Sequence, residues 1–283
     1  MTRIYVFTGP TLSPADARRE LEAIYRPPAA QGDVYRAALD DPWAIAVIDG
    51  YFETVPAVWH KEILWALTQG IRVYGSASMG ALRAAELHRF GMIGVGAVFE
   101  SFRDGTLEDD DEVAVTHGPE ETGFRRLSEA MVNIRSTLRA AESIGVLPPD
   151  SRLALEQLAK RLRYSERSYE ALWTPARAAG IPEAEIAALR RWLPEGRVDQ
   201  KRADALAMLR RIREERDGLR PGPPRVEFEF EHTVFWETVA RSVYVARPEG
   251  PIGNSTVLNP IRGNPKQRKP RARGPVGRRG KAR

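Results

Sequence analysis

The first half of the sequence alternates short apolar runs with stretches of helical character. Three largely apolar runs predict strands: Ile4–Phe7, Ala44–Ile48 and Ile71–Tyr74. The continuous run Ala44–Ile48 is typical of a strand buried on both faces of a sheet. A stretch with helix-favouring spacing or composition follows each run, over residues 14–25, 56–67 and 81–87. Strands separated by helices of this length predict parallel crossovers. We therefore expect an α/β fold with a small parallel sheet and crossover helices in the N-terminal half.

The second half is mainly helical in its pattern. Helical spacing of apolar residues recurs over Leu127–Ser143, Arg152–Arg163, Glu166–Ala179, Pro182–Trp192 and Gln200–Glu215. Apolar and acidic residues alternate over Val226–Phe230, which predicts a late strand, and a last helix is expected over His232–Ser242. The pattern predicts an α/β core over residues 1–145, a mainly helical region over 146–246 and a separate tail over 247–283.

Charge is distributed unevenly along the chain. Residues 247–283 contain 11 Arg or Lys and a single acidic residue, Glu249, whereas residues 1–246 contain 32 basic and 37 acidic residues. The net charge of +5 therefore comes from the tail. Its scarcity of large apolar residues predicts disorder, and its charge predicts nonspecific attraction to nucleic acid. The acidic body does not have the charge of a nucleic-acid-binding surface.

Several kinds of site are excluded by composition. The sequence has no cysteine, which excludes disulfides, thiolate metal ligands and a cysteine nucleophile. The four histidines are too widely spaced for a local metal motif, so no metal is expected. No apolar run approaches the roughly 18 residues that a membrane span needs, and the N-terminus lacks a signal-peptide core. We expect a cytoplasmic protein without membrane contact.

The segment Gly75–Leu87 carries the densest chemical signal, because an expected strand leads through small residues into an expected helix. Ser76-x-Ser78-x-Gly80 has the form of a nucleophile elbow with Ser in place of the first glycine. The helix N-terminus would direct backbone N–H groups toward an oxyanion. The alternative is that Ser78 only caps the helix, since serine is common at that position.

Lysine is scarce, and Lys61 is the only lysine among residues 1–159. A desolvated lysine can lose its proton and act as a base, whereas arginine stays protonated near neutral pH. Lys61 lies between the second and third expected strands, from where it could approach the carboxyl ends of the sheet. The scarcity of lysine is explained equally well if Lys61 is a solvated lysine beside His60 and Glu62.

Two further loops follow expected strands, Thr8–Thr11 and Asp49–Phe52, and should line the same rim as Ser78. Ordinary turn chemistry is the alternative for each. Glu108–Glu112 is a run of five acidic residues, and their mutual repulsion predicts a solvated loop. Such a loop suits docking of a basic partner better than it suits a Mg²⁺ ion.

These segments resemble the TfuA-like family. The resemblance is carried by Ile4–Leu12, Ile48–Phe52, Trp59–Ile63, Gly75–Leu87 and Leu107–Val115, and it covers roughly residues 3–145 in order. It implies a partner of a YcaO-type enzyme in the formation of peptide or protein thioamides. The YcaO enzyme would use ATP to activate a backbone amide, while this chain would need no cofactor.

The resemblance further implies a hydrolase-like Ser–Lys pair that releases sulfide from the C-terminal thiocarboxylate of a ThiS-like sulfur carrier. We assign the pair to Ser78 and Lys61, with Ser76 as the rival nucleophile. A noncatalytic adaptor that docks substrate onto YcaO is the main alternative. An unrelated serine hydrolase acting on small esters is a weaker one.

The remaining site residues are assigned from their expected place at the rim. Backbone N–H groups near Met79 and Gly9 are expected to stabilise the oxyanion. The residues expected to line the substrate-binding site beside them are Thr8, Asp49, Tyr51 and Ser76.

Overall fold

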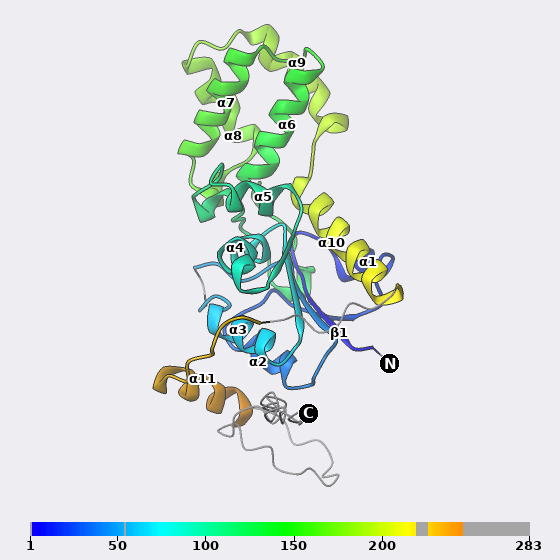
Figure 1. Cartoon of the computed structure of the whole chain (residues 1–283). Helices are drawn as coiled ribbons and strands as arrows, with labels where there is room; N and C mark the ends of the chain where they lie inside the picture. The colour runs from blue at the N-terminus through cyan, green and yellow to red at the C-terminus, as the bar shows by residue number, and fades with distance from the viewer. Residues whose placement is uncertain (1, 54, 219–225, 246–283) are drawn as a thin grey trace, which may run out of the picture. The chain divides into compact units, whose positions relative to one another are not determined.

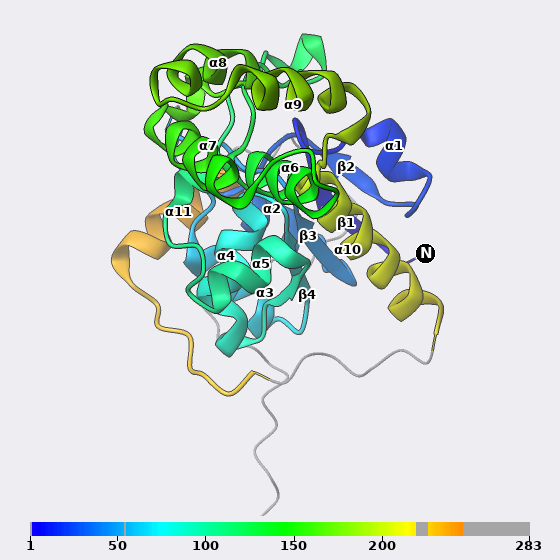
Figure 2. The same ribbon diagram turned by 90° about the horizontal axis from the view of Figure 1, so that it is seen from above.

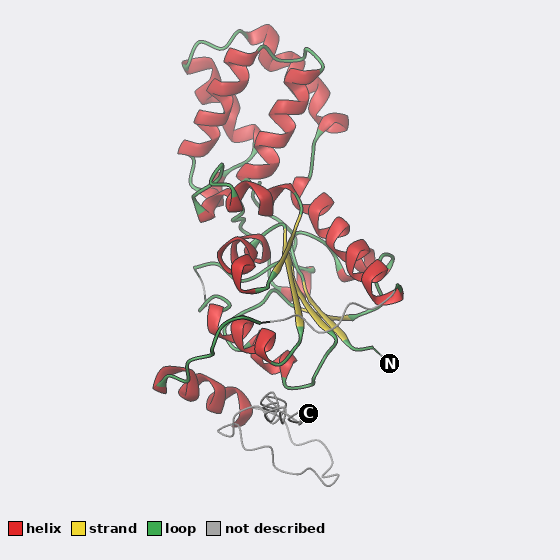
Figure 3. Cartoon of the chain, in the orientation of Figure 1, coloured by secondary structure: helices red, strands yellow, loops and turns green. Residues whose placement is uncertain are grey.

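The computed structural model describes residues 2–53, 55–218 and 226–245. Its core is a single parallel sheet (Figures 1 and 3). The sheet has five strands in the order β2-β1-β3-β4-β5. The strands are β1 (Ile4–Phe7), β2 (Ile24–Arg26), β3 (Ala44–Val47), β4 (Arg72–Ser76) and β5 (Ile93–Val95). The prediction of an α/β fold with a parallel sheet in the N-terminal half is confirmed.

The three central strands are buried along their whole length because helices cover both faces of the sheet. Side chains alternate between the faces, so that Ile45 and Val47 pack in one hydrophobic cluster while Ala44 and Ala46 pack in the other. The first cluster includes α2 (Asp33–Ala38), α3 (His60–Thr68), α4 (Met79–Leu87) and α5 (Ala97–Arg103). The second includes α1 (Pro14–Arg18) and α10 (Gln200–Asp217), which Figure 2 shows along the opposite face.

Four helices build a separate hydrophobic cluster: α6 (Met131–Ser143), α7 (Pro149–Arg161), α8 (Tyr169–Ala178) and α9 (Glu183–Gly196). Their contacts come from apolar stripes that include Leu138, Leu155, Leu172 and Leu189. The chain then returns to the sheet through α10. The start of α10 therefore lies where the helical region meets the sheet, which decides the geometry of the site described below.

A last helix, α11 (Val234–Val245), packs on α2 through aromatic side chains. The rings of Tyr35 and Trp236 meet edge to face at 5.0 Å between centroids. Among the described residues, no helix combines the length and the apolar character that a membrane crossing requires.

The structure departs from the expected elements in several places. Strands β2 and β5 and helices α2 and α5, which are three to seven residues long, were not predicted. The helix expected over residues 14–25 ends at Arg18. The strand expected over Val226–Phe230 is wrong, since these residues form no strand. The tail over 247–283 lies outside the described residues, so its predicted disorder stays a prediction.

Candidate active site

Ser78 lies in a sharp turn between β4 and α4. The Ser78 N–H donates a hydrogen bond to the Ser76 carbonyl over 2.7 Å, and Ala77 between them has a φ of +67°. A γ-turn with positive φ is rare for a residue with a Cβ, and such strain is concentrated at functional sites. The Ser78 side chain makes no capping hydrogen bond to the helix, so its hydroxyl is not used as an N-cap.

Two glycines allow α4 to begin directly against the sheet. A Cβ on Gly80 would lie 1.8 Å from the Val47 carbonyl oxygen, and one on Gly75 would lie 2.1 Å from the Gly80 carbonyl oxygen. No side chain fits at either position. This contact brings the N-terminus of α4, and Ser78 with it, to the carboxyl ends of β3 and β4, where open parallel sheets place their sites.

The lysine beside Ser78 is Lys201, the second residue of α10. Its Nζ lies 3.0 Å from Ser78 Oγ and 2.7 Å from the Val113 carbonyl oxygen, and the residue is 1% exposed. Burial lowers the pKa of Lys201, while the nearby Asp49 carboxylate acts in the opposite direction. A neutral amine at hydrogen-bonding distance from a serine hydroxyl can accept its proton, which is the arrangement that a Ser–Lys nucleophile requires.

Asp49 organises the loop after β1. Its Oδ2 accepts hydrogen bonds from the N–H groups of Gly9 (2.9 Å) and Thr11 (3.0 Å), and its Oδ1 accepts one from Thr11 Oγ1 (2.6 Å). Thr8 Oγ1 donates to the Leu12 carbonyl over 2.7 Å. Thr8 and Gly9 therefore serve the turn, and the Gly9 N–H that was expected at the oxyanion is engaged by Asp49.

The Met79 N–H is the other group of the pair that was expected to donate to an oxyanion. Met79 is the first residue of the nine-residue helix α4, where a backbone N–H has no acceptor within its own helix. The positive end of the helix dipole adds to the attraction for an anion beside Ser78. Gly80, the next residue, donates instead to the Ile48 carbonyl over 3.2 Å.

Ser78 opens onto a cleft of about 170 Å³. Asp49, Tyr51 and Met79 line it as expected, together with residues 113–117 and Tyr164. A second cavity of about 250 Å³ adjoins it, and the two share Phe52, Met79 and Leu82 as lining residues. Ser78 is 8% exposed and is one of the residues that line the cleft.

The structure does not bring Lys61 to Ser78. The Lys61 Nζ donates to the Glu231 carbonyl over 2.6 Å and to Thr233 Oγ1 over 3.3 Å, and it lies above the ring of Phe230. Lys61 thus ties α3 to the segment that precedes α11. Ser76, the rival nucleophile, is fully buried, and its Oγ has no hydrogen-bond partner among the described residues. Neither residue contacts the cleft.

Sequence reasoning missed Lys201 because it is 123 residues away from Ser78. A signal was nevertheless present in the pattern. Lys201 occupies the same helical stripe as Ala205, Met208 and Ile212, all of which are buried. One of only six lysines therefore falls on the apolar face of an amphipathic helix, which indicates a buried amine.

Comparison with known proteins agrees with the resemblance drawn from the motifs. Residues 49–168 match the family model for TfuA-like proteins. A search of curated proteins found no match. The matched segment includes Ser78 and Val113, whereas Lys201 lies beyond its end. The chain therefore carries a TfuA-like domain over residues 49–168.

Proposed function

We propose that this protein releases sulfide from the thiocarboxylated C-terminus of a ThiS-like sulfur carrier and supplies it to a YcaO-type enzyme during backbone thioamidation of a peptide or protein. The observation that carries the proposal is the hydrogen bond between Ser78 Oγ and the buried Lys201 Nζ, beside a cleft and a helix N-terminus. The choice of carrier and partner rests on the TfuA-like domain.

In the acylation step, neutral Lys201 accepts the Ser78 proton as Oγ attacks the thiocarboxylate carbon. The Met79 N–H donates to the oxyanion that forms. The carbon–sulfur bond then breaks, and the Lys201 ammonium returns the proton to the departing sulfur as HS⁻. An ester now joins the carrier to Ser78.

In the deacylation step, Lys201 takes a proton from a water molecule that attacks the ester carbon. The ester bond breaks, and the proton passes to Ser78 Oγ. The carrier leaves as a carboxylic acid, which loses the second proton of the water to solvent and becomes an ordinary carboxylate. The chain's own groups thus supply the nucleophile, the base and the oxyanion donor, while ATP is used by the YcaO partner alone.

Sulfide release by the isolated protein tests the proposal. Native protein should release sulfide from thiocarboxylated carrier, whereas Ser78→Ala should release none above background and should still bind the carrier. Carrier binding without release by the native protein would favour the noncatalytic adaptor. Turnover of small esters alone would favour an unrelated serine hydrolase.

A further inference from the structure

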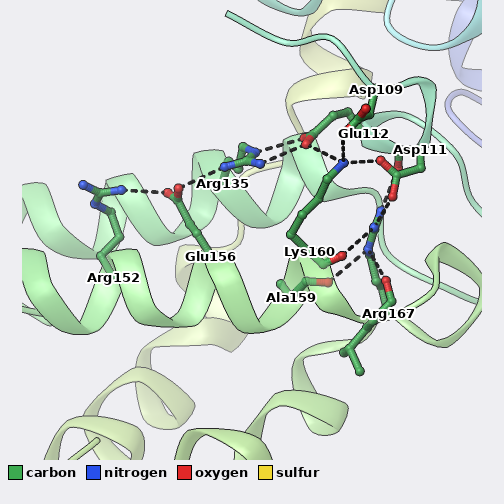
Figure 4. A network of polar contacts seen from close by, with 10 residues as sticks. Asp109, Asp111, Glu112, Arg135, Arg152, Glu156, Ala159, Lys160 and Arg167 are labelled. Atoms are coloured by element: carbon green, nitrogen blue, oxygen red, sulfur yellow. Dashed lines mark hydrogen bonds and ion pairs between the residues drawn. The ribbon is translucent and has the colours of Figure 1, made fainter. Parts of the chain in front are cut away.

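The acidic run Glu108–Glu112 is not a simple solvated loop. Figure 4 shows three of its carboxylates facing cations from the helical region. Asp109, Asp111 and Glu112 pair with Lys160, and Glu112 also accepts a bidentate interaction from Arg135, at 2.9 Å for each nitrogen. The repulsion expected along the run is therefore offset by cations from helices that are distant in the sequence.

Arg167 is the most deeply buried of these cations, with a side chain that is 0% exposed. Its guanidinium donates to both the carboxylate Oδ2 and, over 2.7 Å, the main-chain oxygen of Asp111. The same group also donates to the carbonyls of Ala159 (3.2 Å) and Leu162 (3.1 Å). Arg167 thereby fixes the backbone of Asp111 to the end of α7, and we call this contact between Arg167 and Asp111 the clamp.

Asp111 lies two residues before Val113, and the Val113 carbonyl accepts the hydrogen bond from Lys201 Nζ. Asp111 is the middle residue of a short 3₁₀ turn, Asp110–Glu112, and Glu112 alone separates it from Val113. A shift of the Asp111 backbone would therefore move the acceptor that holds the amine.

The Val113 carbonyl has a chemical use in the proposed reaction. A neutral amine has two N–H groups and one lone pair, and the lone pair must face Ser78 Oγ to take its proton. Donation of one N–H to Val113 orients the amine so that the lone pair remains for Ser78. Misplacement of a catalytic group by about 1 Å can lower a rate about 100-fold.

We propose that Arg167 is a positioning residue for Lys201, acting through Asp111 and the Val113 carbonyl. This inference rests on the proposed function, because it takes Lys201 to be the base. A buried ion pair is by itself weak evidence for a contribution to stability, so the clamp is better explained by the backbone position that it enforces.

The test compares Arg167→Lys and Asp111→Asn with Arg152→Met. Arg152 is a matched control because it belongs to the same network, in which it pairs with Glu156 (Figure 4), but does not contact the acidic run. It also pairs with Glu142. Each variant is checked for folding by circular dichroism. Asp111→Asn keeps the main-chain acceptor and nearly the same side-chain volume. This variant can therefore still test the inference if Arg167→Lys does not fold.

The readouts are kcat, KM and the pH profile of sulfide release, with the rate at which a fluorophosphonate probe labels Ser78 as a measure independent of the carrier. We expect kcat and labelling to fall about 10- to 100-fold in Arg167→Lys and by a smaller factor in Asp111→Asn, which keeps the main-chain acceptor, with little change in KM. The pH midpoint should move upward, because a loosened amine regains solvent. The charged groups around Lys201, namely Asp49, Arg126, Glu129 and Asp199, are unchanged in all three variants.

Arg152→Met should keep the native kcat, labelling rate and pH midpoint. Folded clamp variants that behave like native protein in all three readouts would overturn the inference. Native protein that labels at Ser78 but releases no sulfide would overturn the proposed substrate alone, and the labelling rates would still decide the role of Arg167. A native Ser78 that neither labels nor releases sulfide would overturn both.

Discussion

Two lysines occupy the second position of their helices, yet their surroundings are opposite. Lys61 in α3 points to the segment before α11 and donates to a main-chain oxygen and a threonine hydroxyl. Lys201 in α10 is buried against Ser78 and Val113. The difference comes from the helical face, because Lys201 shares its stripe with core residues whereas the buried stripe of α3 begins at Glu62 and Ile63. The face of the helix on which a lysine lies decides whether its amine is buried and can serve as a base. Its distance from a motif along the chain does not.

The largest expected difference between the two lysines is in catalysis. Lys201→Arg should lower the rate of sulfide release by about 10²–10⁴-fold, because guanidinium stays protonated and cannot act as a base. Lys61→Arg should retain the native rate, since charge and hydrogen-bonding capacity survive. Rates are measured with saturating carrier on variants whose circular dichroism matches the native protein. If Lys61→Arg lowered the rate of sulfide release as much as Lys201→Arg, Lys61 would have to take part in catalysis.

The pH dependence of the native protein sharpens the same comparison. Because burial lowers the pKa of Lys201, the amine is neutral at a lower pH than an ordinary lysine. Activity should therefore rise with pH to a plateau, with a midpoint below about 10.4, the value of an unperturbed lysine. Lys61→Met should have the same midpoint as native protein, measured from kcat between pH 6 and 10. Activity that still rises in proportion to the hydroxide concentration at pH 10 would show that the pKa of Lys201 is not lowered.

Stability should change in opposite directions at the two positions. Lys201→Met removes an amine that must be desolvated, so the free energy of unfolding at pH 7 should rise by about 1–2 kcal/mol. Lys61→Met should lower it by about 0.5–1 kcal/mol through loss of the hydrogen bond to Glu231.

The gain from Lys201→Met should also depend on pH. A lysine whose folded pKa is lowered binds fewer protons when folded than when unfolded, so native stability rises with pH up to the unfolded pKa. The advantage of the methionine variant should consequently shrink between pH 7 and 10. Urea unfolding at both values measures this, and an advantage that grows with pH would contradict a lowered pKa.

The smallest effect is expected at Ser76. Its hydroxyl is buried without a partner among the described residues, so Ser76→Ala removes an unsatisfied polar group rather than an interaction. Sulfide release should stay at the native rate, and the melting temperature should be equal or higher. A Ser76→Ala variant that is folded but inactive would show that Ser76, and not Ser78, carries the reaction.

The parts of the fold that the sequence predicted correctly are those with a strong local pattern. Strand β1 was predicted with its observed bounds, and β3 and β4 nearly so, because their apolar runs are buried on both faces. The helices that build the second cluster were likewise readable from their spacing. Strand β5 was not, since Ile93–Val95 includes a glycine and is only partly buried.

Only the site residues that belong to local sequence motifs could be predicted. Ser78 and Met79 follow from the small residues that a strand-to-helix turn requires, and Asp49 from its place after β3. The contacts of Lys201 and Arg167 depend on how the helical region returns to the sheet, at separations of 123 and 56 residues. No spacing rule covers such distances, so the predicted partner was the nearest lysine in sequence instead of the nearest in space.

The central claim is that Ser78 forms an ester with the carrier, and hydroxylamine competition tests it most directly. Hydroxylamine should intercept the ester and convert the carrier to its C-terminal hydroxamate, which intact-mass measurement detects. Native protein should produce hydroxamate in step with sulfide, and Ser78→Ala should give only the uncatalysed background. Sulfide release by native protein with no hydroxamate above the Ser78→Ala level would contradict the account.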